Sequence, residues 1–320
     1  MIQLNPILPR YAFLLLISIS LIVGCQSEQT QIADFNGQRA FEEVEALVQI
    51  SPRNAGTPEG LRAAQHIFQR LKDFGVEADI ETFTDMTPEG EKEFRNVIGR
   101  IPGKNDQWII LGSHYDTMPG IQNFQGANDS GSSTGVLIEL ARILSLRQDL
   151  RTTMRQPETG IVLAFFDGEE GIAGYIPGDG LHGSRYMARQ LKRSGEDKNV
   201  KAMILLDMVG DKDLHFSLPL NSSQSLVKEV LKAAHATGYR GYFSLSPNSV
   251  ITDDHVPFLE IGIPAIDIID FSFGSKPGSN DHWHTNQDSL ENITAESLEI
   301  TGSITLQLLK QMAFNLETDK

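Results

Sequence analysis

Apolar residues recur at helical spacing in some stretches of this chain and form short continuous runs in others. The helical spacing predicts helices over residues 41–50, 61–74, 132–147, 184–194, 221–237 and 294–315. The short apolar runs predict strands over residues 76–83, 94–101, 108–113, 161–166, 202–207 and 265–269. Strands that alternate with helices are typical of an open sheet covered on both faces. We therefore predict an α/β fold, a three-layer αβα sandwich with a central, mostly parallel mixed sheet.

Acidic and histidine side chains stand where several of the predicted strands end. The residues at or just beyond a strand end are His114, Glu169, Glu170 and Asp207. In open α/β sheets, ligands bind beyond the carboxyl ends of the strands. We therefore expect these side chains to share one site.

The adjacent carboxylates Glu169 and Glu170 are the most informative pair in the chain. Neighbouring side chains at a strand end point in different directions, so one carboxylate can bind a metal while the other carries a proton. A zinc acyl-transfer or peptidase site needs this division of labour. The alternative is a solvated surface pair, which is common for two glutamates in a row.

Three further candidates have structural alternatives. Asp116 lies two positions after His114 and would orient a ligating imidazole ring, although a loop histidine held by ordinary hydrogen bonds is the alternative. Asp129 directly precedes a predicted helix, where an aspartate often serves as the N-cap. Asp207 ends an apolar strand, where an unpaired carboxylate is costly, which favours a metal or a hydrogen-bond partner.

Two later motifs complete the candidate site. Asp253 belongs to a pair of acids, which suggests one structural and one catalytic role, with a solvent-facing turn as the alternative. In the segment 281–285, a histidine such as His284 would ligate a metal and Trp283 would stack on a substrate. The alternative is a surface loop.

The amino-acid composition limits the metal ligands, nucleophiles and partners that the chain can have. Cys25 is the only cysteine, so the mature domain has no internal disulfide, no thiolate ligand and no thiol nucleophile. Any metal must be held by histidine and carboxylate side chains, which suits zinc. The net charge of −15 argues against a nucleic-acid partner, because a phosphate backbone repels such a protein.

The first residues have the character of a targeting segment. Arg10 precedes an apolar run, 11–23, that is short for a transmembrane helix and ends in Gly24 and Cys25. This pattern resembles a bacterial lipoprotein signal, although a plain uncleaved anchor is the alternative. We expect a signal peptide over 1–24, a tether over 25–37 that carries lipid on Cys25, and a catalytic domain over 38–320. The protein would then be exported and anchored in the cell envelope, at the periplasmic side of the outer membrane or at the cell surface.

The order of the motifs resembles the zinc aminopeptidase and glutaminyl cyclase family across residues 40–315. The shared order is His-x-Asp, Asn-Asp-Ser, Glu-Glu, a strand-end Asp, and a late His-Thr. Four stretches look closer to the cyclases than to the aminopeptidases: Phe-Asp-Gly-Glu-Glu at 166–170, Gly-Leu-His-Gly-Ser-Arg-Tyr at 180–186, Asp-Asp-His-Val-Pro-Phe-Leu at 253–259 and Trp-His-Thr at 283–285. One departure is Asp267, which stands where animal cyclases carry a histidine.

The resemblance implies a zinc aminopeptidase-like fold and assigns roles to the candidate residues. One zinc ion would be bound by Asp129, Glu170 and His284. Glu169 would be the proton shuttle, hydrogen-bonded in a network with Asp207 and Asp253. Two more side chains also receive roles: Trp283 would line the substrate pocket, and His114 would occupy a position that binds a second metal in aminopeptidases.

The implied reaction converts an N-terminal glutamine of a peptide or exported protein into pyroglutamate. Zinc would stabilise the developing oxyanion while the α-amine attacks the side-chain amide, and Glu169 would carry the proton to the departing ammonia. The main alternative is an aminopeptidase with two zinc ions, the second held by His114 and Asp207, and with Glu169 as the base for water. A non-catalytic surface binding module is a further alternative.

Overall fold

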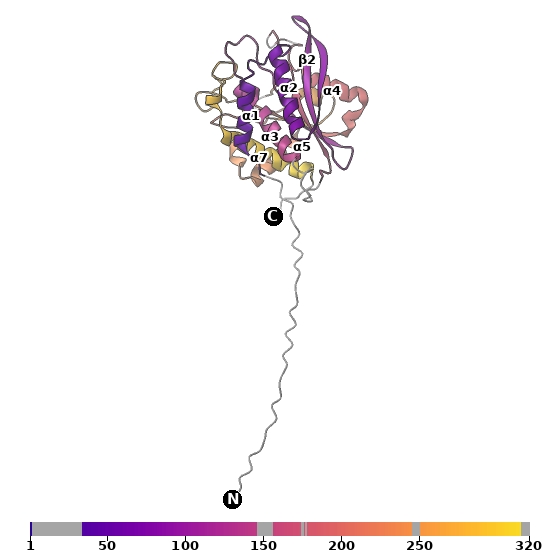
Figure 1. Cartoon of the computed structure of the whole chain (residues 1–320), viewed down its shortest axis with the longest axis vertical. Coiled ribbons are helices and arrows are strands. Elements are labelled where there is room, and N and C mark those ends of the chain that lie inside the picture. The colour runs from indigo at the N-terminus through magenta and orange to yellow at the C-terminus, as the bar shows by residue number, and fades with distance from the viewer. Residues whose placement is uncertain (2–33, 146–155, 174–175, 177, 245–249, 315–320) are drawn as a thin grey trace.

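The computed structural model describes Met1 and residues 34–145, 156–173, 176, 178–244 and 250–314 (Figure 1). Apart from Met1, the predicted signal peptide lies outside these residues, as do Cys25 and the tether up to residue 33. No helix within the described ranges is both long enough and apolar enough to cross a bilayer.

A six-stranded mixed sheet forms the centre of the molecule, in the order β1-β2-β4-β3-β5-β6. Its strands are β1 (Glu77–Thr87), β2 (Gly90–Ile101), β3 (Trp108–His114), β4 (Gly160–Phe166), β5 (Val200–Asp207) and β6 (Ala265–Ile269). The last four run parallel to one another, whereas β2 pairs antiparallel with both β1 and β4. The predicted mostly parallel, mixed sheet is therefore confirmed.

Helices cover both faces of this sheet. They are α1 (Gly37–Val48), α2 (Pro58–Asp73), α3 (Ser133–Ser145), α4 (His182–Ser194), α5 (Gln224–Ala236), α6 (Val256–Glu260) and α7 (Ala295–Met312). The larger apolar core joins one face of the sheet to α1, α2, α3, α5 and α7, and a smaller core joins the other face to α4 and α6. Figure 1 accordingly shows α4 on the opposite side of β2 from α1 and α2. The predicted three-layer sandwich is confirmed.

Local sequence explains where these helices begin. Thr57 accepts a hydrogen bond from the backbone N–H of Gly60, with Pro58 in the first helical turn, and Thr294 caps α7 in the same way through Ser297. The helix predicted over 221–237 begins later, at Gln224, because Ser223 has an extended backbone and is the N-cap. The short helix α6 was not predicted, since five residues are too few for helical spacing to be recognised.

The central strands are buried, and their pairing decides where the polar residues at their carboxyl ends lie. Every residue of β4 is buried, and β3 and β5 are buried along nearly their whole length. Strands with two covered faces form continuous apolar runs in the sequence. Their parallel pairing brings the carboxyl ends of β3, β4 and β5 to one edge of the sheet.

Candidate active site

The polar residues predicted at strand ends meet at that edge. His114 ends β3 and Asp207 ends β5, while Glu169 and Glu170 follow β4 after a short turn. Asp129 comes from a distorted helical turn, Ala127–Ser132, that precedes α3. The two carboxylate oxygens of Asp129 face the rings of His114 and His284, so Asp129 does not act as the simple N-cap that its sequence position suggested.

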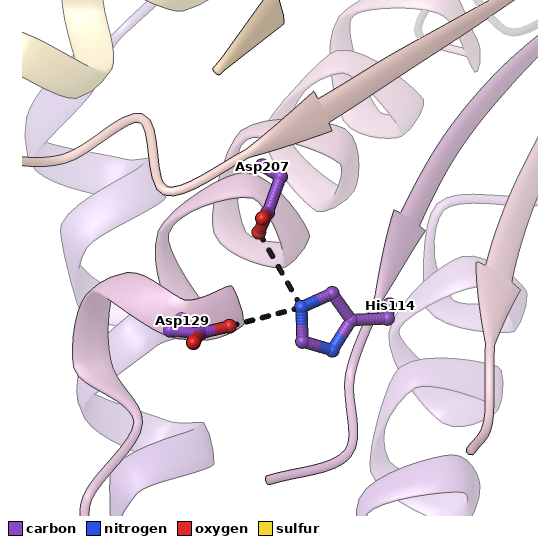
Figure 2. A group of neighbouring side chains, drawn as sticks. All are labelled: His114, Asp129 and Asp207. Atoms are coloured by element: carbon purple, nitrogen blue, oxygen red, sulfur yellow. Dashed lines mark ion pairs between the residues drawn. The ribbon is translucent and has the colours of Figure 1, made fainter. Parts of the chain in front are cut away.

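One group of side chains joins His114, Asp129 and Asp207 (Figure 2). Nε2 of His114 lies 3.0 Å from Oδ1 of Asp129 and 3.3 Å from Oδ1 of Asp207. Figure 2 shows both carboxylates pointing at the same ring nitrogen from different elements. All three side chains are buried.

A second group joins Asp129, Glu170 and His284. Nε2 of His284 lies 3.2 Å from Oδ2 of Asp129 and 3.1 Å from Oε1 of Glu170. His284 has a φ of +53°, a left-handed backbone that few residues other than glycine adopt. Asp129 belongs to both groups, and each of its oxygens faces a different imidazole.

The donor atoms suit a divalent cation. In each group one imidazole nitrogen and two carboxylate oxygens lie within 4.8 Å of one another. Nε2 of His114 and Oδ1 of Asp207 lie 3.3 Å apart, yet neither atom makes a well-directed hydrogen bond, although both are buried. Buried polar atoms without such bonds are costly unless they bind an ion or a water. Histidine and carboxylate ligands in this number are typical of zinc centres.

Electrostatics show how strongly the site favours positive charge. Burial lowers the pKa of His284, but the contacts with Asp129 and Glu170 outweigh burial and raise it to about 10. Burial also opposes protonation of His114, yet its acidic neighbours raise its pKa well above the ordinary value. Burial alone would raise the pKa of Asp129, but the two histidines hold it below its usual range. The raised pKa values of both histidines indicate that the site stabilises positive charge, which a bound metal ion would supply.

Asp116 holds the Glu169–Glu170 turn in place. Its Oδ1 accepts the backbone N–H of Glu169 at 3.1 Å, and its Oδ2 accepts that of Glu170 at 3.2 Å. Oδ1 also lies 3.5 Å from Nδ1 of His114, whereas Asp129 and Asp207 face Nε2, so Asp116 stands where it can orient the ring as predicted. A single buried side chain thus ties the end of β3 to both glutamates.

A cavity of about 240 Å³ opens beside these groups. Its lining residues are Asp129, Glu169, Asp207, Val250, Ile251, Thr252, Asp253, Ile269, Phe271 and Trp283. Trp283 stacks on the ring of His284 with centroids 4.1 Å apart and meets Phe271 edge-on at 5.1 Å. The cavity thus has an acidic side next to the metal groups and an apolar wall.

Three carboxyl groups that line this cavity, those of Glu169, Asp207 and Asp253, have pKa values raised mainly by burial. Burial raises the pKa of Glu169 well above its ordinary value, and the charge of Asp253 adds to the rise while His114 opposes it. Burial likewise raises the pKa of Asp253 and of Asp207. The hydrogen-bond network predicted for Glu169, Asp207 and Asp253 remains a prediction. Asp267 lies buried behind them, and neither of its oxygens accepts a hydrogen bond.

Sequence reasoning missed two buried residues next to the site, Arg53 and Asp288. Asp288 accepts the backbone N–H groups of Asn128 and Asp129, and Arg53 donates to carbonyl oxygens of the neighbouring backbone. Neither residue stands at a predicted strand end or in a motif of the resemblance, so the single sequence carries no signal for them.

Comparison with known proteins places the chain among relatives with the same architecture. A model of the family described as "Peptidase family M28" matches residues 96–309. The glutaminyl-peptide cyclotransferase of Drosophila melanogaster is 28% identical over 262 residues, which cover 75% of this chain and 71% of that protein.

Two solved structures extend this similarity. The glutaminyl cyclase of an Acidobacteriales bacterium is 36% identical, with a TM-score of 0.81, and the match covers 90% of this chain and 98% of that one. A leucine aminopeptidase precursor from Bacteroides thetaiotaomicron is 28% identical, with a TM-score of 0.76, and the match covers 90% and 99% of the two chains. The family model spans more than half of the sequence, and the likeness to these structures spans nearly the whole described domain. The chain therefore belongs to peptidase family M28.

Proposed function

We propose that this protein is a zinc-dependent glutaminyl-peptide cyclotransferase. It converts the N-terminal glutamine of peptides or proteins into pyroglutamate and releases ammonia. The observation that carries the proposal is the position of Glu169, which lines the cavity beside Asp129 but belongs to neither metal-binding group. The similarity to glutaminyl cyclases along nearly their whole length supports the same activity.

Asp129, Glu170 and His284 are the residues that would hold the zinc ion. When bound, zinc supplies Lewis-acid chemistry, because its charge stabilises negative charge that develops on an oxygen in the transition state. The raised pKa of His284, which its contacts with Asp129 and Glu170 cause, supports this assignment, because the same carboxylates that favour a proton would favour a metal ion.

Glu169 moves the proton. The α-amine of the substrate attacks its own side-chain amide carbon, so a carbon–nitrogen bond forms within one residue and proximity is built in. Glu169 takes the proton from the attacking amine and delivers it to the departing nitrogen, which leaves as ammonia. Burial raises the pKa of Glu169 and the neighbouring Asp253 adds to the rise, which makes its carboxylate a stronger base for the proton of the amine.

The wall of the cavity would hold the peptide. Trp283 and Phe271 offer aromatic faces, and Val250 and Ile251 add aliphatic surface. An apolar wall excludes water from the acidic side and orients the substrate through its side chain and backbone. Asp253 would act through Glu169 by helping to keep its pKa raised, and Asp207 in turn raises the pKa of Asp253.

A zinc aminopeptidase is the second candidate function. The group His114, Asp129 and Asp207 offers ligands for a second metal ion, and the similarity to a leucine aminopeptidase precursor is a further reason to test it. Glu169 would then act as the base for an attacking water. Zinc content separates the two functions, with one ion expected for a cyclase and two for an aminopeptidase.

The site of action remains a proposal from the sequence. Export and a lipid on Cys25 would place the enzyme in the cell envelope, where its substrates would be exported proteins and peptides. The test is fractionation of cells that produce wild type or Cys25→Ala. Lipid anchoring predicts that the wild type stays with membranes and that the variant does not.

The decisive experiment incubates the full-length protein, loaded with zinc, with a short peptide that begins with glutamine. Mass spectrometry follows the product, and Glu169→Gln controls for spontaneous cyclisation. Loss of ammonia from an intact peptide is the expected result. Release of the first residue would identify an aminopeptidase instead and would reassign His114 and Asp207 to a second zinc. A Glu169→Gln variant with full turnover, or one that loses zinc, would refute the shuttle role.

A further inference from the structure

Arg53 is the one arginine or lysine that is buried within the described residues, and its side chain is 0% exposed. Its Nε donates to the carbonyl oxygen of Tyr115 at 2.6 Å. Its two terminal nitrogens donate to the carbonyl oxygens of Gln125 and Gly126 and to the hydroxyl of Ser51, each at 2.7 Å. A charge buried at this depth is costly unless it is well bonded, which calls for a reason to keep it there.

The acceptors of Arg53 belong to the two segments that carry metal-binding candidates. Tyr115 follows His114 directly, whereas Gln125 and Gly126 open the turn that leads to Asp129. Arg53 therefore ties the end of β3 to this turn through backbone atoms alone. At neutral pH the guanidinium stays charged, although burial lowers the pKa of Arg53 to about 10.

Gly126 shows how closely the turn lies against the guanidinium. Its φ is +54°, and a Cβ atom there would lie 2.6 Å from the carbonyl oxygen of Asp129 and 3.2 Å from Nη2 of Arg53. Only glycine combines this backbone with so little room. The turn is thus packed directly on Arg53 with no space for adjustment.

Asp288 binds the same turn by accepting hydrogen bonds from backbone N–H groups of the turn. Oδ1 of Asp288 accepts the N–H of Asn128 at 2.7 Å, and Oδ2 accepts that of Asp129 at 3.0 Å. Asp288 is fully buried and lies four positions after His284. Arg53 donates hydrogen bonds to the carbonyl oxygens of Gln125 and Gly126, where the turn starts. Asp288 accepts hydrogen bonds from the N–H groups of Asn128 and Asp129, further along the turn.

We propose that Arg53 and Asp288 are positioning residues of the metal centre, because together they fix the backbone turn that presents Asp129. Asp129 is the carboxylate common to both metal-binding groups, so a shift of this turn would disturb both groups at once. The proposal concerns metal binding and holds for a cyclase or an aminopeptidase alike, so its failure is distinct from a failure of the proposed reaction.

Two conservative substitutions separate positioning from simple stabilisation. Arg53→Lys keeps the charge but loses the planar fork that reaches three carbonyl oxygens, and Asp288→Asn keeps one acceptor and turns an amide donor toward an N–H. Loss of a group that orients a metal ligand typically weakens metal affinity about 10- to 100-fold. We expect this loss in both variants.

The measurement is the zinc dissociation constant of the full-length protein, obtained by competition with a fluorescent chelator at a temperature where each metal-free variant is folded. Arg70→Lys and Asp211→Asn are the matched controls. Arg70 pairs with Glu43 on the surface, and Asp211 is a buried aspartate that accepts the N–H of Asp213 away from the site. Both controls should keep wild-type zinc affinity.

Wild-type zinc affinity in folded Arg53→Lys or in folded Asp288→Asn would overturn the proposal, whatever the loss of stability. If one variant does not fold, the other decides. Failure of both to fold would also overturn it, because the pair would then support the whole fold rather than the metal centre.

Discussion

Replacing Asp116 by asparagine tests how the Glu169–Glu170 turn is held. Asp116 is 0% exposed, and its two oxygens each accept one backbone N–H of the turn. Asparagine has the same shape but a single acceptor oxygen. In Asp116→Asn, one of the two N–H groups therefore loses its partner and faces an amide donor.

The expected loss in the free energy of unfolding follows from these two hydrogen bonds. A hydrogen bond to a charged group contributes about 1.5 to 3 kcal/mol, and a buried donor left without a partner costs about 1 to 3 kcal/mol. We expect the free energy of unfolding to fall by about 2 to 4 kcal/mol, since part of the loss is recovered by the remaining acceptor. The displaced glutamates should also weaken zinc binding and turnover by about 10- to 100-fold each.

The assay combines denaturant unfolding of the metal-free protein with zinc affinity and steady-state kinetics. Asp211→Asn is the control, because it changes another buried aspartate that bonds backbone N–H but lies outside the cavity. The control should lose stability and keep kcat. If Asp116→Asn lost stability but kept wild-type kcat and zinc affinity, the positioning role of Asp116 would be wrong.

Three further predictions concern pH, the substrate pocket and zinc. Burial lowers the pKa of His255 from 6.5 to about 4, so between these values the unfolded chain binds a proton that the folded protein does not. Stability should therefore fall by up to about 3 kcal/mol as the pH drops through this window, and unfolding curves of His255→Gln should show a shallower fall; parallel curves would contradict this account. Trp283→Leu should raise KM by about tenfold, because an aromatic contact in the cavity wall is lost, and an unchanged KM would place the peptide elsewhere. Removal of zinc with a chelator should lower the free energy of unfolding by about 3 kcal/mol relative to protein at free zinc near 100 times Kd, and coincident unfolding curves would exclude a metal bound to the folded state.

Much of the fold was predictable because its signals are local. The strands β3, β4 and β5 are covered on both faces, so each appears as a continuous apolar run and needs no partner to be recognised. The amphipathic helices α2 and α7 could also be recognised locally, because their apolar residues recur at helical spacing and a threonine caps each start. The strand order and the antiparallel place of β2 could not be derived, because pairing depends on contacts between distant segments.

The candidate site also combines residues that the sequence predicted with contacts that only the structure shows. His114 and Asp207 stand out in the sequence because a polar residue that ends an apolar strand is conspicuous, and the structure brings both into one group with Asp129. Their roles at a metal ion remain predictions. The contribution of Trp283 to the cavity wall follows the same pattern, since the sequence suggested the residue and the structure shows what it contacts.

The sequence by itself determined the α/β class, the edge of the sheet where polar residues gather and the kind of ligands that a metal would meet there. These features depend on residue type and on spacing within short segments. Only the tertiary structure decided that Asp129 is shared by two groups, that Asp116 holds both glutamates, and that Arg53 and Asp288 bind one turn. Arg53 and Asp288 reach this turn across as many as 73 and 160 sequence positions, and their contacts run through backbone atoms that are alike in every sequence. No local pattern can encode such contacts, because they exist only once the sheet has brought the segments together.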